Sequence, residues 1–170
     1  DPVTLYVPEL KDAGFEKVTI ENLLNMQSNM AYIEYDNPFD KHVIFNFTDH
    51  LEDEILDLGL RKTPDEQFRY KSGDNALLGL ILDRALGEKT ITQYTQERIW
   101  DPLGMEYAGS WSTDSLSSDF EKMETGVNAR ARDFAKLGAL FLNGGVWQGK
   151  QVISKAWVEE ATAPYFPDGI

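Results

Sequence analysis

The sequence has 170 residues, enough for one domain with a buried core, and 42% of them are apolar. Its 29 acidic and 16 basic residues give a net charge of −13, which argues against a nucleic-acid interface, because phosphate binding needs clustered Lys and Arg. The sequence has no cysteine, which excludes disulfides, thiolate metal sites and a thiol nucleophile, and it has no apolar run near the roughly 20 residues of a membrane helix.

The first part of the chain predicts short helices separated by loops. Pro and Gly interrupt its start, and Thr19 is placed to cap the first helix. The expected segments are, in chain order, a loop over residues 1–17, a helix over residues 20–26, an irregular segment over residues 28–47, a helix from Thr48 or Asp49 to about Gly59, and an extended segment over residues 60–69.

The second part of the chain predicts longer helices and little strand. Ser72 or Asp74 is expected to cap a strongly apolar helix that Gly87 ends. The remaining expected segments are a helix from Thr90 to about Trp100, stopped before Pro102, a polar loop over residues 106–127, a helix over residues 129–142, a turn at Gln148-Gly149 joining two short strands, and a last helix capped by Ser154.

The most informative segment is the stretch 68–79, where Tyr70, Lys71 and Ser72 directly precede the apolar helix. On this short motif alone, structural roles remain open. Tyr70 can be a half-buried tyrosine at a helix entrance, and Ser72 can be a helix cap. The sequence around the motif is therefore needed to distinguish a structural role of these residues from a catalytic one.

Five blocks in order carry a family resemblance: residues 1–10, residues 18–28, the Tyr70–Lys71–Ser72 element, residues 101–105 and residues 126–138. With them, nearly the whole chain resembles the serine β-lactamase and penicillin-binding-protein family, and in particular the class C-type β-lactamase-related hydrolases, which include esterases and amidases. In the second block the family usually has Ser-Gly where this chain has Ser28-Asn29. Because Asn tolerates a positive φ better than most residues, we expect this turn to persist.

The family usually has three catalytic elements, and this sequence holds only the tyrosine element. No Ser is followed by Lys three positions later, so a Ser-x-x-Lys nucleophile is absent. Lys71-Ser72-Gly73 spells a variant of the Lys-Thr-Gly-type element, but it precedes a helix and is interpreted as coincidence. The resemblance therefore implies a mainly α fold. Residues 1–170 would form a single partial domain, the helical lobe of a β-lactamase-like α/β fold with the sheet lobe largely missing.

The resemblance also implies catalytic roles for Tyr70 and Ser72 in an intact hydrolase. Tyr70 would move a proton between the serine, its lysine and the leaving group, and Ser72 would hydrogen-bond the lysine. A phenol with a pKa near 10 is a poor base at neutral pH, and a nearby lysine ammonium lowers that pKa. Because the sequence lacks this lysine, we expect the pKa of Tyr70 to be ordinary here.

Tyr35 is a candidate substrate-binding residue, because the resemblance places Tyr32, Glu34 and Tyr35 along one wall of the cleft. Packing is the alternative role for these side chains. His42 and His50 lie eight residues apart without a metal-ligand pattern. We predict no metal site and no cofactor.

The resemblance implies a fragment of a serine hydrolase that cleaves an ester, an amide or a β-lactam through an acyl-serine intermediate. The isolated chain is expected to be inactive. The alternative is a non-catalytic binding module derived from the same fold. Expected partners are a small-molecule ester, amide or β-lactam substrate of the parent protein and the missing sheet lobe or a second copy, but not nucleic acid. No membrane segment is expected in this chain. A periplasmic or secreted location of a bacterial parent is compatible with the resemblance.

Overall fold

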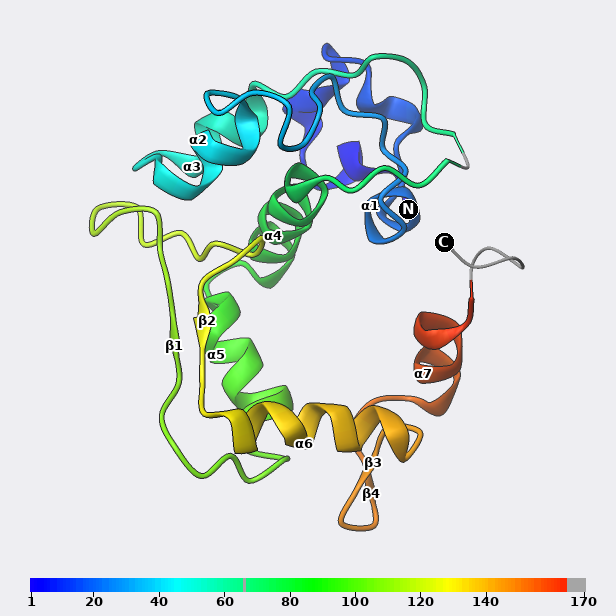
Figure 1. The fold of residues 1–170 in the computed structure, drawn as a ribbon, viewed down its shortest axis with the longest axis vertical. Helices are drawn as coiled ribbons and strands as arrows, with labels where there is room; N and C mark the ends of the chain where they lie inside the picture. The colour runs from blue at the N-terminus through cyan, green and yellow to red at the C-terminus, as the bar shows by residue number, and fades with distance from the viewer. Residues whose placement is uncertain (66, 165–170) are drawn as a thin grey trace. The chain divides into compact units, whose positions relative to one another are not determined.

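The structure is a computed structural model that describes residues 1–65 and 67–164 (Figure 1). The chain divides into two compact units. Unit 1 comprises residues 1–91 and 111–127, and unit 2 comprises residues 92–110 and 128–170. The helices are α1 (Ile20–Leu24), α2 (Lys41–Phe47), α3 (Leu51–Leu56), α4 (Ser72–Leu86), α5 (Ile91–Thr95), α6 (Ala131–Leu142) and α7 (Lys155–Thr162), and the strands are β1 (Ser110–Trp111), β2 (Val127–Asn128), β3 (Val146–Trp147) and β4 (Lys150–Gln151). The prediction of a mainly helical fold is confirmed.

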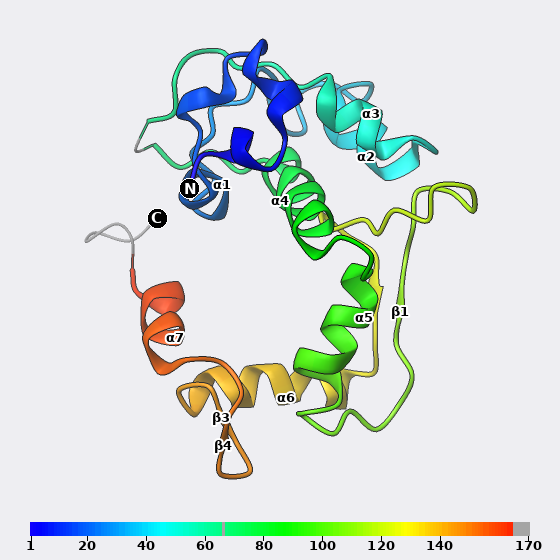
Figure 2. The ribbon, with the colours of Figure 1, turned by 180° about the vertical axis from the view of Figure 1, so that it is seen from behind.

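Unit 1 is built around α4, which α1, α2 and α3 contact. Both views of the ribbon show α2 and α3 side by side near α4 (Figures 1 and 2). Helix α4 buries Ala76, Leu77, Leu80 and Ile81, with Leu77 and Leu80 almost completely inaccessible to water. Full burial of one such side chain contributes roughly 1.5–3 kcal/mol. The entrance of α4, which carries the candidate catalytic residues, is therefore anchored to a packed core.

Residues 1–17 form three short 3-10 helices instead of the expected plain loop: Val3–Leu5, Pro8–Lys11 and Phe15–Lys17. Val3, Val7, Leu10 and Phe15 lie in the core of unit 1 with no exposed surface. Short 3-10 turns have little intrinsic stability, so this burial orders the segment. The next element agrees with its prediction, because Thr19 Oγ1 accepts a hydrogen bond from the Asn22 backbone N at 3.1 Å and caps α1.

The prediction that residues 28–47 are irregular was wrong at their end, where α2 forms. Asp40 caps α2 by accepting a hydrogen bond from the Lys41 backbone N at 2.8 Å. The Lys41 ammonium then binds Glu54 of α3 at 2.8 Å. Helix α3 begins at Leu51, later than expected, because Thr48 Oγ1 accepts a hydrogen bond from His50 N in the turn before it.

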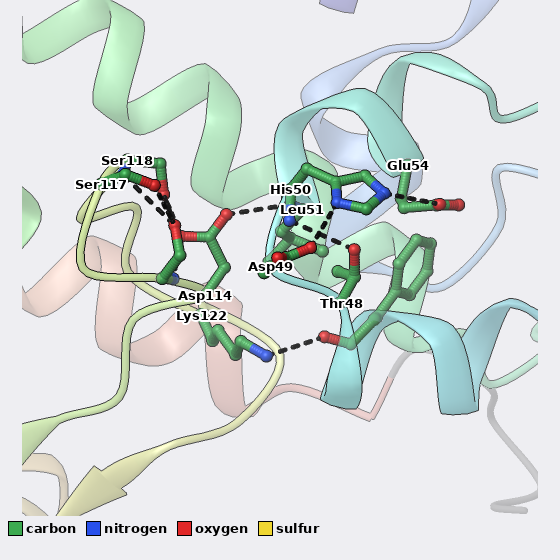
Figure 3. Close-up of polar contacts among 11 residues, drawn as sticks. Thr48, Asp49, His50, Leu51, Glu54, Asp114, Ser117, Ser118 and Lys122 are labelled. Atoms are coloured by element: carbon green, nitrogen blue, oxygen red, sulfur yellow. Dashed lines mark hydrogen bonds and ion pairs between the residues drawn. The ribbon is translucent and has the colours of Figure 1, made fainter.

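The segment 111–127, expected as a polar loop, holds the ends of α2 and α3 in unit 1 (Figure 3). Asp114 Oδ2 accepts a hydrogen bond from the backbone N of Leu51, the first residue of α3, at 2.9 Å. Lys122 Nζ donates to the carbonyls of Phe45 at 3.1 Å and Asn46 at 2.8 Å, near the end of α2. A carboxylate at a helix start and an ammonium at a helix end both complement unpaired backbone groups and the helix dipole.

Replacing Asp114 with Ala is expected to lower the free energy of unfolding by about 1–3 kcal/mol, because α3 loses a charged N-terminal hydrogen-bond partner. Urea denaturation of both proteins measures the difference. Ser117→Ala is the matched control, since the exposed Ser117 hydroxyl hydrogen-bonds to Ser115 in the same turn and, among the described residues, to no helix end. Equal stabilities of the Asp114→Ala and Ser117→Ala variants would contradict the capping role.

Unit 2 contains α6 and the hairpin of β3 and β4. Helix α5 continues into a π-helical turn over Gln96–Trp100, so the expected helix before Pro102 is confirmed with a different geometry at its end. The buried carboxylate of Asp133, in the first turn of α6, accepts hydrogen bonds from the backbone N of Glu106 at 2.8 Å and of Tyr107 at 3.3 Å. The Glu106 hydrogen bond is the main cause of the lowered pKa of Asp133.

The predicted hairpin at Gln148-Gly149 is confirmed, with Val146 facing Gln151 and Trp147 facing Lys150 in antiparallel register. The residue before it, Gly145, has a φ of +81°, and a Cβ there would lie 2.0 Å from the Ile153 carbonyl oxygen, so only glycine fits. The predicted cap of α7 is also present, since Ser154 Oγ accepts a hydrogen bond from the Trp157 backbone N at 3.2 Å.

Among the described residues, none of the helices has the length and apolar content to cross a bilayer.

Candidate active site

A pocket of about 470 Å³ in unit 1 brings the loop after α1 together with the segment that leads into α4. Its described lining combines aromatic and aliphatic side chains with a few charged groups: Asn29, Met30, Tyr32, Ile33, Glu34, Tyr35, Arg61, Arg69, Tyr70 and Lys71. Small-molecule sites typically have about 300–1,000 Å³ and this kind of mixed lining. The pocket lining contains two of the three predicted site residues, Tyr70 and Tyr35, and the third, Ser72, follows the lining residue Lys71 in the sequence.

The backbone of the pocket is fixed by the turn that the sequence predicted at Ser28-Asn29. Asn29 has a φ of +67°, the conformation for which Gly or Asn was expected. Its carbonyl accepts a hydrogen bond from the Arg61 N at 3.0 Å, and its Nδ2 donates to the Thr63 carbonyl at 3.2 Å. Met30 and Leu60 form an antiparallel bridge beside it. The two lining segments are therefore joined through the backbone.

The Tyr70 side chain is 46% exposed and stacks on Tyr35, with 6.3 Å between ring centroids and 12° between ring planes. Partial burial raises the pKa of the Tyr70 phenol, and the neighbouring Tyr35 and Glu34 raise it further. The expectation of an ordinary pKa was therefore wrong. The Tyr70 hydroxyl is a proton donor at neutral pH in this chain, and no neighbouring cation is among the causes of its shift.

The Ser72 side chain does not cap α4, contrary to one of its predicted roles. Ser72 is the first residue of the helix, and both its backbone N and its Oγ donate to the carboxylate of Glu34, at 3.1 Å and 2.7 Å. The hydroxyl of Tyr32 accepts the next backbone hydrogen bond, from Gly73 N at 2.8 Å. Residues of the preceding loop thus cap α4 from outside, and they fix the position of the Ser72 hydroxyl.

Lys71 is a site residue that the sequence did not single out. Its side chain is buried, its ammonium donates to the Tyr32 carbonyl, and it lies 4.3 Å from the centroid of the Tyr32 ring. Burial is the main cause of the lowered pKa of Lys71. Within the part of the chain that the structure describes, its ammonium has no ion pair with a carboxylate. The only signal in the sequence was its place inside the Tyr70–Ser72 element.

Asp74, two residues into α4, was expected as a possible cap and instead points into the core. Its side chain has no exposed surface, and across residues 1–65 and 67–164 its two oxygens and the nearby Ser28 hydroxyl have no hydrogen bond of normal geometry. Burial raises the pKa of Asp74 to about 7, although Ser28 and the Lys71 ammonium offset part of the effect. Asp74 is therefore a buried carboxyl group that is easily protonated, close to the candidate catalytic residues.

Tyr35 combines high exposure, an unusual backbone conformation and two ring contacts. Its side chain is 74% exposed although it is aromatic, and its φ is +65°, which is strained for a bulky residue. Its ring contacts His42 edge-on, with 5.2 Å between centroids, in addition to the stack on Tyr70.

Among the described residues, no three His, Cys, Asp or Glu side chains are grouped as a metal ion would require.

Comparisons with known proteins identify the family of the chain. The sequence profile of the Beta-lactamase family matches residues 1–170. The chain is 26% identical to the 6-aminohexanoate-dimer hydrolase of Paenarthrobacter ureafaciens, and the match covers 95% of the chain but 43% of that protein. The fold resembles a Bacillus anthracis protein assigned as a 6-aminohexanoate-dimer hydrolase, with a TM-score of 0.81, 26% identity, and 94% of this chain and 45% of that one covered.

A more distant match supports the same fold. A penicillin-binding-protein homolog from Caulobacter crescentus superimposes with a TM-score of 0.69 at 19% identity, over 96% of this chain and 53% of that protein. The 170 residues thus span about half the length of the relatives that they match.

Proposed function

Because the chain belongs to the Beta-lactamase family, we propose that it supplies the tyrosine-bearing helical part of a serine hydrolase. The intact protein would cleave an amide or ester bond through an acyl-serine intermediate. Tyr70 would act as the proton-transfer residue, and Ser72 would position a lysine that comes with the nucleophile. The observation that carries the proposal is the placement of Tyr70 on the wall of a pocket of ligand size, with the Ser72 hydroxyl held beside it by Glu34.

The charge state of Tyr70 fits a division of the catalytic residues between this chain and the rest of the protein. Here the pKa of Tyr70 is raised by burial and by its neighbours, so the phenol can donate a proton but cannot accept one at neutral pH. An ammonium brought near it by a Ser-x-x-Lys element would lower this pKa, because an opposite charge favours the phenolate. Tyr70 could then take a proton from the serine and deliver it to the leaving group.

We infer that the substrate is a linear amide or an analogous ester. The relative from Paenarthrobacter ureafaciens is named for hydrolysis of the 6-aminohexanoate dimer, a linear amide with an aliphatic chain. Tyr32, Tyr35, Ile33 and Met30 give the pocket the apolar surface that such a chain would cover.

The test compares the purified 170-residue chain with a longer protein that also contains the nucleophile element. The longer protein is expected to hydrolyse 6-aminohexanoate dimer or a short-chain nitrophenyl ester and to form an acyl adduct that mass spectrometry detects. The 170-residue chain is expected to form no adduct with a fluorescent β-lactam or a reactive ester, because it has no Ser-x-x-Lys nucleophile. A stable adduct on the 170-residue chain would contradict this division of roles. A folded longer protein that hydrolyses neither substrate class and acylates with neither probe would overturn the proposed function.

A further inference from the structure

The lining of the pocket has a charge opposite to that of the chain. The chain carries a net charge of −13, but the described lining residues include three cations, Arg61, Arg69 and Lys71, against the single carboxylate of Glu34. Positive charge gathered in a concave, partly apolar site of an acidic protein concentrates the field there and attracts anions.

Two of these cations have no hydrogen-bonded acidic partner in the part of the chain that the structure describes. Arg69 is neutralised by Asp65, with 2.8 Å between Arg69 Nη1 and Asp65 Oδ1. The Glu34 oxygens are occupied by the backbone N and the hydroxyl of Ser72. Across the described ranges 1–65 and 67–164, neither the Arg61 guanidinium nor the Lys71 ammonium forms an ion pair.

The two unpaired cations are held near each other, although like charges repel. Burial is the main cause of the lowered pKa of Lys71, and the charge of Arg61 lowers it further, although the Glu34 carboxylate acts in the opposite direction. The backbone keeps Arg61 there, because its N donates to the Asn29 carbonyl at 3.0 Å next to the bridge between Met30 and Leu60. Lys71 is fixed in turn by the carbonyl and ring of Tyr32. An anion between them would relieve the repulsion without a change in the backbone.

We propose that this pocket binds the carboxylate of a short aliphatic acid, with the Arg61 guanidinium as its direct partner and Lys71 as a fixed charge behind it. Arg presents a planar set of donors that matches a carboxylate, and the aromatic lining accommodates the alkyl chain. The inference deepens and rests on the proposed function, in which it assigns this pocket to the acid end of a linear amide substrate.

Binding of hexanoate and of its neutral analogue hexanamide to the intact protein tests the inference without turnover. Hexanoate is expected to bind at least about tenfold more tightly than hexanamide by NMR titration or calorimetry, and this preference should weaken with added salt. Arg61→Gln is expected to remove the preference, whereas Arg61→Lys should retain part of it. Lys62→Gln is the matched control, because Lys62 is the next residue along the chain, is exposed and pairs with Asp65 outside the pocket lining.

Equal binding of hexanoate and hexanamide would overturn the anion site. So would an unchanged preference in the Arg61→Gln protein, or an equal loss in the Lys62→Gln protein. The outcome is independent of the proposed reaction: a protein that binds hexanoate through Arg61 but hydrolyses no amide or ester keeps the binding site and loses the proposed function.

Discussion

Replacing Tyr70 with Phe is expected to lower kcat/KM of the proposed intact hydrolase by about 10²–10⁴-fold, the usual contribution of a positioned proton-transfer group. The change removes only the phenolic oxygen, so the stack on Tyr35 and the partial burial of the ring are retained. Because the lost interaction would act in the transition state, kcat and kcat/KM should fall together while KM changes little. Steady-state kinetics on the amide and the ester substrates measure both parameters.

Tyr35→Phe is the matched control for this prediction. Tyr35 lines the same pocket and stacks on the same ring, but we assign it substrate contact and no proton transfer. Its replacement should therefore change KM more than kcat. A Tyr70→Phe enzyme within about twofold of the wild type, or a loss of kcat of equal size in the Tyr35→Phe enzyme, would remove Tyr70 from the proposed proton-transfer step.

Local sequence signals predicted those parts of the fold in which residues close in the sequence form hydrogen bonds with each other. The caps of α1 by Thr19 and of α7 by Ser154 join residues three positions apart. The hairpin at Gln148-Gly149 follows from a turn sequence between two short strands. In these cases the hydrogen bonds that define the element join residues within one short segment, so the sequence pattern alone predicts them.

Elements that depend on distant partners were missed or misassigned. The start of α4 is capped by Glu34 and Tyr32, which lie 38 and 41 positions before the backbone groups that they bind. The ends of α2 and α3 are completed by Lys122 and Asp114, more than 60 positions away. The hydrophobic pattern of a short segment does not predict such contacts, since they form only when the loop and the helix pack together.

In the candidate site, too, residues marked by a local motif were predicted, and residues marked only by tertiary packing were not. The motif around Tyr70 and Ser72 was sufficient to select both residues, because the family resemblance rests on a short run of consecutive residues. Lys71, Asp74 and Arg61 were not selected as site residues. Lys71 and Asp74 are set apart by burial, and the exposed Arg61 by the lack of an ion pair in the described structure. These properties follow from tertiary packing and carry no sequence signature of their own.

Replacing Asp74 with Asn is expected to change the pH dependence of stability more than any other single substitution of a buried group considered above. The folded-state pKa of about 7 lies above the ordinary 3.8, so the unfolded chain loses its proton first as the pH rises. The folded state binds more protons between about pH 4 and pH 7, and the free energy of unfolding falls over that interval. A shift of roughly three pH units corresponds to about 4 kcal/mol, fully expressed above pH 7.

The Asp74→Asn protein cannot ionise at this position, so its stability should lack this loss. Burial of the amide costs about 1–3 kcal/mol at every pH. We therefore expect the variant to be no more stable than the wild type at pH 4 and to become more stable than it by pH 8. Asp53→Asn makes the same change of charge on an exposed position of α3 and should leave the two stability curves nearly parallel.

Urea denaturation from pH 4 to pH 8 measures this difference directly. Parallel curves for the wild type and the Asp74→Asn protein would mean that Asp74 ionises in the folded chain as it does in water, which requires a partner for its carboxylate. The oxygens of Asp74 and Ser28 that lack a hydrogen-bond partner among the described residues would then be satisfied in solution. The same titration repeated on the longer protein of the proposed function shows whether its additional residues supply such a partner, because a donor reaching Asp74 would lower its pKa and abolish the loss of stability.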